Sequence, residues 1–368
     1  MSSTRPQASR RTMKKIIQKL RKGEIPEPPS RITNDTVSEY RKRVLAGGRK
    51  FKYPIQYSRH KLVINTVIIS ALALVLVLII GWWQLYPRQN MSEFAYRVVA
   101  VVPLPVANVN GESVRYSDYL MKLRSAEHYL RQKEKATLTG NDGVRQISYL
   151  KQQAMNDTIA DAYATQLARS KGIVVSDDEL ANFLRSQRQS EDGEISERTY
   201  YAVIKDYYNW SSEEYAHTMR AKLLRQKVSY EIDETAREIA TSAGKLVNAA
   251  GDKPWAVVVQ ENAKSLPGVT YGASGLVPRT NQDGGLAVQA AQLKKGEISK
   301  PVTSLNGDGY YIIRLVDSND TQVSYEFVKI PLTTFQRQLD ALYGDNKIKI
   351  HIDVPFRDEQ GGQTDERQ

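Results

Sequence analysis

The chain has 368 residues and a formal net charge of +11, from 52 Lys and Arg against 41 Asp and Glu. It contains no cysteine, which excludes disulfides, thiol catalysis and cysteine-ligated metal sites. Its four histidines, His60, His128, His217 and His351, are widely scattered. We therefore expect neither a zinc site nor a Ser-His-Asp enzyme, and we predict no metal and no cofactor.

Residues 1–61 form a strongly basic tail. They hold 17 Lys and Arg against four acidic residues, a net charge of +13, which leaves −2 for the rest of the chain. Met13, Ile16, Ile17 and Leu20 are spaced to form one apolar stripe on a short helix. This pattern indicates contact with anionic lipid, for which the candidate residues are Lys14, Lys15, Lys19, Arg21 and Lys22. A disordered basic tail that only sets topology is the alternative. Nucleic-acid binding is not favoured, because no aromatic residues interleave the charges.

A transmembrane helix is predicted at residues 62–86. No charged side chain lies between Lys61 and Arg88, and about 20 apolar residues are enough to cross a bilayer. The alternatives are a buried core helix and a cleaved signal peptide. The run is longer than the apolar part of a signal peptide and ends in aromatic residues, including Trp82 and Trp83, which favours an uncleaved signal-anchor. The basic flank predicts a single-pass protein of the cell membrane, with a cytoplasmic N-terminus and an extracytoplasmic C-terminal part.

A mainly helical region is expected after a linker at residues 87–105. Residues 106–114 read as two strands joined by a turn at Asn110-Gly111. Ser176-Asp-Asp-Glu179 and Ser211-Ser-Glu-Glu214 have capping-box spacing and so mark two helix starts. Six helices are predicted, at about residues 117–135, 145–171, 176–189, 196–207, 211–224 and 234–249. The 21 tyrosines fit either a peptide-binding surface or, for most of them, an ordinary core.

The character of the chain changes after Gly251, where glycines accumulate and apolar runs shorten. Residues 310–316 and 323–330 are predicted to form a β-hairpin, and residues 347–354 a last strand. The polar residues 357–368 are predicted to be disordered. The fold class that these elements indicate is α+β.

Four segments, taken in order, resemble the SurA/PrsA-type extracytoplasmic folding factors. Residues 106–114, 171–180 and 210–227 are similar to parts of their helical chaperone region. The segment from Leu293 to Val302, followed by Gly309-Tyr-Tyr-Ile-Ile-Arg-Leu315, resembles the parvulin pattern "L-K-x-G-E-I-S-x-P-V … G-Y-H-I-I-K-L". The resemblance covers about residues 106–330. It implies a SurA-N-like chaperone domain at 106–233 and a parvulin-like prolyl isomerase domain at 234–356.

The sequence departs from the parvulin pattern at the positions that matter for catalysis. Tyr311 stands where parvulins place a histidine, and residues 228–233 supply neither the second histidine nor a long first strand. Gln282 and Ala291 occupy positions where parvulins carry Met and Phe. The catalytic residues are therefore unknown. We hypothesise that residues 323–330 replace the first strand, which in parvulins pairs antiparallel with the last, so that the domain is effectively a circular permutation. The candidates for a remnant peptide groove are Tyr311, Tyr325, Phe327 and Leu286, with ordinary core residues as the alternative.

These observations favour a membrane-anchored, extracytoplasmic, chaperone-like protein. Its predicted partners are the lipid bilayer and unfolded or exported polypeptides, held in a cradle between the helical part and the parvulin-like domain. An active peptidyl-prolyl isomerase and a structural adaptor in a cell-envelope complex are the two alternatives.

Overall fold

The computed structural model describes residues 33–52, 54–190, 193–251 and 253–354. The chain divides into two compact units, Met1–Ile80 and Gly81–Gln368. The predicted segment at residues 357–368 lies outside the described residues, as do the candidate lipid-contact residues Lys14, Lys15, Lys19, Arg21 and Lys22.

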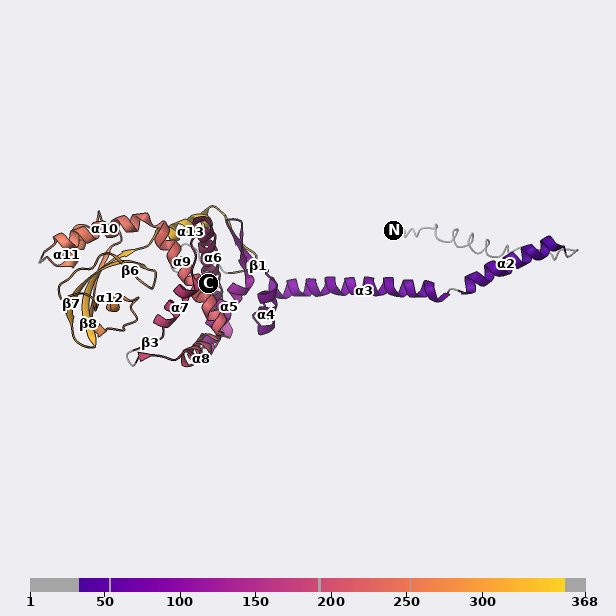
Figure 1. Cartoon of the computed structure of the whole chain (residues 1–368), viewed down its shortest axis with the longest axis horizontal. Helices are drawn as coiled ribbons and strands as arrows, with labels where there is room; N and C mark the ends of the chain where they lie inside the picture. Colours follow the sequence, from indigo (N-terminus) through magenta and orange to yellow (C-terminus); the bar gives the residue numbers. More distant parts are fainter. Residues whose placement is uncertain (1–32, 53, 191–192, 252, 355–368) are drawn as a thin grey trace, which may run out of the picture. The chain divides into compact units, whose positions relative to one another are not determined.

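The first unit contains helix α2 (Asn34–Lys52) and most of helix α3 (Pro54–Leu85). Within α3, the segment Lys61–Leu85 is long and apolar enough to cross a membrane, and no part of its most apolar window is buried. Figure 1 shows α3 as one continuous helix. Within it, the Thr66 hydroxyl donates to the Leu62 carbonyl at 2.8 Å. The predicted helix is present, and its crossing of a membrane stays a prediction.

A short helix, α4 (Glu93–Val101), lies where a linker was expected. Its N-cap is Ser92, whose hydroxyl accepts a hydrogen bond from the Ala95 amide at 3.2 Å. The segment predicted as a linker at residues 87–105 thus contains a helix, because Ser92 caps it and one side of it packs into the core.

Five helices of the helical core follow, and a sixth, α10, begins the sheet part, so the six predicted helices are confirmed. They are α5 (Tyr116–Gln132), α6 (Gly140–Lys171), α7 (Asp177–Ser186), α8 (Glu197–Tyr208), α9 (Ser212–Ile232) and α10 (Glu234–Ala249). Both capping boxes are present, at Ser176 with Glu179 and at Ser211 with Glu214. The predicted strand–turn–strand forms β1 (Pro105–Val109) and β2 (Glu112–Arg115), and two short strands, β3 (Gln189–Ser190) and β4 (Gly193–Glu194), precede α8.

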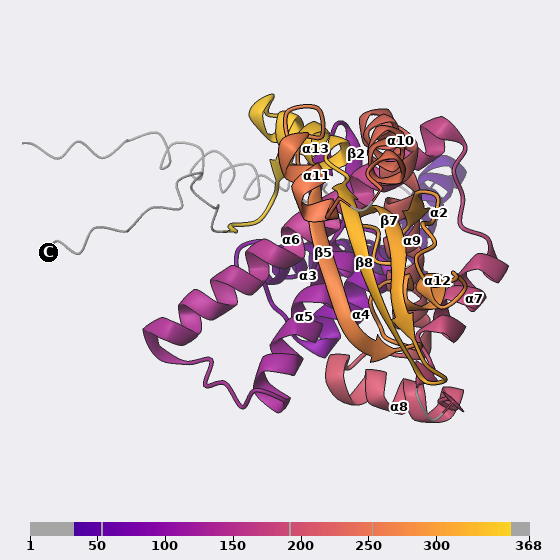
Figure 2. The ribbon, with the colours of Figure 1, turned by 90° about the vertical axis from the view of Figure 1, so that its left-hand side faces the viewer.

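The sheet part comprises α11 (Trp255–Glu261), β5 (Thr270–Pro278), α12 (Leu286–Ala290), β6 (Val302–Thr303), β7 (Gly309–Ser318) and β8 (Gln322–Pro331). Its four strands are antiparallel in the order β5-β8-β7-β6. Figure 2 shows β5, β8 and β7 side by side. Ile312 and Val328 pack with α10 and α11 on one face, while Ile313 and Leu315 pack with α12 on the other. The predicted hairpin and the α+β class are confirmed.

The chain then returns to the helical core through α13 (Thr334–Gly344) and β9 (Ile348–Ile350). Strand β9 pairs antiparallel with β1, which gives the order β2-β1-β9. Phe335, Leu339, Ile352 and Val354 are buried in the same core as α5 and α6. The last strand is shorter than the predicted strand at residues 347–354. Residues 334–354 pack with the helical core, whereas they were predicted to belong to a parvulin-like domain at residues 234–356. The physical reason is a long-range strand pairing that no local pattern specifies.

Asp233 lies at the joint where the chain passes between the helical core and the sheet part. It is fully buried, and its Oδ1 accepts a hydrogen bond from the Ala236 amide at 3.0 Å, at the start of α10. Its Oδ2 accepts from the amides of Thr333 and Thr334 at 2.7 and 2.9 Å, at the start of α13. Burial raises the pKa of Asp233, but the hydrogen bonds from these three amides outweigh it and hold the pKa below its ordinary value. One carboxylate thus ties the outgoing and the returning segment of the chain together.

Candidate functional site

The helical core carries an open hollow of about 560 Å³, which we call the helical groove. Its walls come from α5, α6, α9 and the residues between α8 and α9. Half of its lining is apolar or aromatic: Ala126, Tyr129, Leu130, Leu150, Ala154, Tyr208, Trp210 and Met219. A concave surface of this composition is typical of a ligand-binding site.

Helical periodicity explains why these side chains share one wall. Ala126 and Leu130 are four residues apart on α5, and Leu150 and Ala154 have the same spacing on α6. Residues four apart lie one above the other on the same face of a helix. Each helix therefore presents a short apolar stripe to the groove, and α9 adds Met219, whose flexible side chain adapts to irregular shapes.

Charged groups at one side of the helical groove compensate one another. The Lys122 ammonium lies 2.5 Å from Asp161 Oδ2, and the Arg225 guanidinium lies 3.2 Å from Asp161 Oδ1 and 3.5 Å from Asp157. Burial, followed by the nearby charge of Arg225, lowers the pKa of Lys222. The groove therefore combines an apolar wall with a nearly neutral polar side.

A larger hollow of about 860 Å³ adjoins the helical groove and reaches the sheet part; we call it the interdomain hollow. It is lined by α6, α9, α13 and the turn at Asn306-Gly307, and it shares Asp157, Lys222 and Arg225 with the helical groove.

Hydrogen bonds beside the interdomain hollow hold the two parts in register. The side-chain amide of Gln226 donates to the Leu305 carbonyl at 3.0 Å. The Tyr230 hydroxyl donates to the Gly309 carbonyl at 2.7 Å. These bonds hold the turn at Asn306-Gly307 against α9 at the edge of the interdomain hollow.

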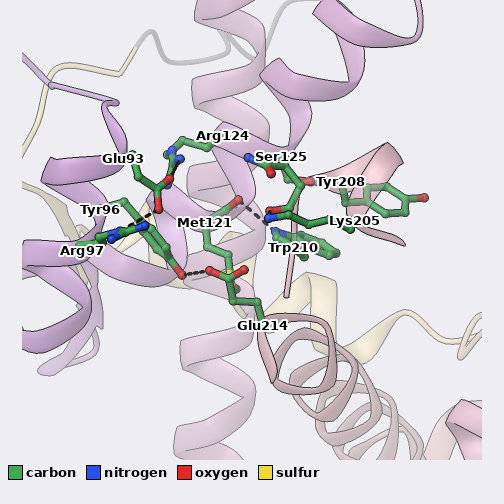
Figure 3. A pocket seen from close by; sticks show the side chains of 11 residues that line it. Glu93, Tyr96, Arg97, Met121, Arg124, Ser125, Lys205, Tyr208, Trp210 and Glu214 are labelled. Atoms are coloured by element: carbon green, nitrogen blue, oxygen red, sulfur yellow. Dashed lines mark hydrogen bonds and ion pairs between the residues drawn. The ribbon is translucent and has the colours of Figure 1, made fainter. Parts of the chain in front are cut away.

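A third, smaller hollow of about 290 Å³ lies beside α4 (Figure 3). Figure 3 shows Glu93 between Arg97 and Arg124, and it pairs with both. The Tyr96 hydroxyl donates to Glu214, and the Trp210 indole N–H donates to the Met121 carbonyl at 3.3 Å. This polar hollow shares Ser125, Tyr208 and Trp210 with the helical groove. The three hollows thus form a series from α4 to the sheet part.

The tyrosines serve two purposes. Tyr200 and Tyr215 are joined by a hydroxyl–hydroxyl hydrogen bond of 2.7 Å, and Tyr215 is only 5% exposed. Burial raises the pKa of Tyr215, and the bond to Tyr200 raises it further. By contrast, Tyr207 and Tyr208 are 41% and 40% exposed. Some tyrosines are therefore core residues, as Tyr215 is, while Tyr207 and Tyr208 are exposed, and a peptide-binding role of the exposed ones stays a prediction.

The four predicted groove residues lie together on one face of the sheet. Leu286, Tyr311 and Tyr325 are buried, and the ring centroid of Phe327 lies 5.6 Å from that of Tyr311. The hydroxyl of Tyr311 donates to Asp308 at 2.8 Å, and that of Tyr325 donates to Asp283 at 2.6 Å. These side chains fill the space between α12 and the sheet.

The helical groove was not predicted from the sequence, although Leu130 and Met219 lie in helices that were predicted. The one signal for the groove in the sequence is that the segments forming α5 and α9 carry apolar residues beyond a single narrow stripe. Among the described residues, no group of three or more His, Asp or Glu side chains is arranged to hold a metal ion.

Comparison with known proteins gives a family for the helical part. Residues 55–229 match the family model described as the SurA-like N-terminal domain. No curated protein sequence matches the chain. A solved structure from a study of PEB4 and Cj1289, described as two structurally related SurA-like chaperones of Campylobacter jejuni, has 14% sequence identity and a TM-score of 0.23. The match covers 66% of this chain and 90% of that chain.

Proposed function

We propose that the chain, whose residues 55–229 match the SurA-like N-terminal domain, binds unfolded segments of exported polypeptides in the helical groove and the interdomain hollow. The observation that carries the proposal is the apolar and aromatic lining of an open groove that faces a second, larger hollow. An unfolded segment has exposed apolar side chains and free backbone groups, and the two hollows offer partners for both.

The size of the groove sets the expected strength of binding. Burying one large apolar side chain contributes about 1.5–3 kcal/mol. Two or three such side chains would contribute about 4–8 kcal/mol, which corresponds to dissociation constants between about 1 mM and 1 µM. Binding in this range is reversible and requires no covalent chemistry, as a chaperone needs.

We further propose that α3 anchors the protein in the cell membrane, with the second unit on the extracytoplasmic side. The support is physical: the apolar side chains of Lys61–Leu85 are unburied in the structure, and a lipid environment would remove them from water. The basic residues before Leu62 favour a cytoplasmic N-terminus.

The sheet part is proposed to be a parvulin-like domain in permuted form and without isomerase activity. Strand β8 pairs antiparallel with β7 along its length, as the first parvulin strand does with the last. Tyr311, which stands where parvulins have a histidine, is buried and bonded to Asp308. A buried side chain with a committed partner is poorly placed to act on a bound proline.

The experiment that tests client binding is suppression of aggregation of an unfolded protein by the full chain in detergent micelles. Tyr208→Ser should weaken client binding about tenfold, because roughly 1.4 kcal/mol of aromatic burial is lost. Tyr207→Ser is the matched control: the neighbouring tyrosine is equally exposed but does not line the groove. Equal effects of the two substitutions would remove the groove from the proposal.

The same preparation separates the alternatives. If the unchanged chain does not suppress aggregation even in excess, a structural adaptor is the better description. If it accelerates isomerisation of a proline peptide as a true parvulin does, the proposal of an inactive sheet part is refuted.

A further inference from the structure

We propose that α4 is a membrane-contacting helix, whose exposed apolar stripe lies in the boundary between the lipid headgroups and the acyl chains. The proposal goes beyond client binding and depends on the proposed crossing of the membrane by α3.

The stripe follows helical spacing. Phe94, Val98, Val101 and Val102 stand at i, i+4, i+7 and i+8, and they are 77%, 36%, 84% and 45% exposed. Residues at these intervals lie on one side of the helix or just beyond its end. The other side of α4 is committed to the protein, because Ala95 and Val99 are buried in the helical core.

The chain keeps α4 close to the end of α3. Only residues 86–92 separate the two helices, and part of this segment folds back on α3. The amides of Arg88 and Asn90 donate to the carbonyls of Trp83 and Gln84, at 3.1 and 2.9 Å. If α3 spans the bilayer up to its aromatic end, α4 therefore begins at the bilayer surface.

The last turn of α3 is also fastened to the helical core. Leu85 is only 5% exposed, and its carbonyl accepts a hydrogen bond from the Tyr116 hydroxyl at 2.6 Å. The hydroxyl of Tyr86 donates to the Pro105 carbonyl at 2.7 Å. Within the second unit, these bonds hold Leu85 and Tyr86 against the same core that carries α4.

The chemistry around the stripe fits lipid. Trp82 and Trp83 are 58% and 45% exposed, and tryptophan is enriched at the membrane–water boundary. The Arg88 guanidinium lies 4.6 Å from the ring centroid of Trp83, and the side chain of Arg97 is 76% exposed, so both cations are placed to meet anionic headgroups.

A protein partner is a poorer fit for the same surface. Four side chains, one of them aromatic, offer roughly 400 Å², whereas each partner of a stable protein–protein interface buries about 800 Å². A second copy of the chain is therefore not favoured. Glu93, Tyr96 and Arg97 line the polar hollow beside α4, so contact of the stripe with lipid would place the start of the series of hollows near the bilayer surface.

The absence of cysteine makes a direct test available. Single variants Phe94→Cys and Val101→Cys of the full chain are labelled with an environment-sensitive fluorophore and reconstituted in vesicles of phosphatidylcholine and phosphatidylglycerol. Quenching by nitroxide lipids, with the nitroxide placed shallow or deep, reports the depth of each label. Leu74→Cys, within α3, and Val288→Cys, an exposed position on α12, are the controls.

The expected result is at least threefold stronger shallow quenching at positions 94 and 101 than at position 288, with deep quenching at position 74. Labels at 94 and 101 that behave like the label at 288, while 74 is quenched, would overturn the inference and leave the anchor intact. Labels shielded from water but not quenched by lipid would also overturn it, since a protein, such as a second copy, would then cover the stripe. An unquenched label at position 74 would refute the proposed anchor, and this inference with it.

Discussion

Replacing Asp233 by alanine removes the acceptor of three backbone hydrogen bonds at the joint between the helical core and the sheet part. The carboxylate is fully buried, so its amide partners are shielded from solvent. The amides of Ala236, Thr333 and Thr334 would be left without their partner. We expect this single substitution to be among the most destabilising in the second unit.

The magnitude follows from the partners that are lost. A buried amide left unsatisfied costs about 1–3 kcal/mol, and loss of an N-cap costs about 1 kcal/mol. The three contacts share one carboxylate and their costs are not additive, so the expected loss is about 3–5 kcal/mol of the free energy of unfolding. Asp233→Asn keeps one acceptor oxygen and should cost less, about 2 kcal/mol.

Urea unfolding of the full chain in micelles, followed by tryptophan fluorescence, measures the loss. Hydrogen exchange adds a local readout: the amides of α13 and β9 should lose protection in Asp233→Ala before those of α6. Asp320→Ala, an exposed aspartate in the turn between β7 and β8, is the control and should change little. A loss below 1 kcal/mol for Asp233→Ala, with α13 still protected, would refute the view that this carboxylate holds the joint.

The pH dependence of stability gives a second prediction for Asp233. A carboxyl group whose pKa is lower in the folded than in the unfolded chain stabilises the fold at pH values above its unfolded pKa. The difference in stability between the native chain and the Asp233→Asn variant should therefore persist from neutral pH to about pH 4 and narrow as the pH falls further, measured by the same unfolding curves. His217 should show the opposite pH dependence, because its hydrogen bond to Asp118 raises the pKa of the His217 imidazole. The contribution of this group to stability is therefore complete below about pH 6.5 and is lost as the pH rises. Asp118→Asn should lower the pKa of His217 in an NMR titration. Gly309→Ala should destabilise the sheet part by about 2 kcal/mol or more in thermal unfolding. Gly309 has φ of +151°, and a Cβ there would lie 2.2 Å from a carbonyl oxygen of β8. Glu326→Gln should cost about 2 kcal/mol by the same assay, since it leaves the partly buried Arg314 without its ion pair; no change would contradict that reasoning.

Local sequence signals were sufficient to locate a helix where its first residues form a capping box. The capping boxes at Ser176 and Ser211 located two helices to within a residue, because side chain and backbone satisfy each other within four residues. Helix α4 lacks such a signal: Ser92 caps it, but Ala95 stands at the third position and cannot complete a box. A single serine before nine residues is too weak a pattern to distinguish a helix from a linker.

Strand β5 was missed for a related reason. Gly272 and Gly275 interrupt its apolar pattern, and glycine in a strand usually argues against that assignment. The structure explains Gly272, since a Cβ at this position would lie 2.4 Å from the ring of Phe327 on the neighbouring strand. Tertiary contact, rather than strand propensity, selected this residue.

The candidate site could be predicted only in outline. Apolar stripes on α5, α6 and α9 identify residues that face other helices, but they do not distinguish a filled interface from an open groove. The distinction depends on distances between helices, which the sequence does not encode locally. The predicted residues Tyr311 and Tyr325 show the reverse problem, because aromatic residues expected at a groove fill a core.

Because α13 and β9 return to the helical core, folding of that core cannot be completed until the C-terminal part of the chain is available. Val109 pairs with Ile348, and everything between α9 and α13 is an insertion between the two halves of that core. In the proposed extracytoplasmic orientation, the second unit would emerge from a translocation channel with its N-terminal end first, and the edge of β1 would be exposed until β9 has followed it. An unpaired strand edge favours pairing with other chains, and a long-range pairing forms slowly. We therefore expect the second unit to be most prone to misassembly during its own export, in the interval before Ile348 emerges.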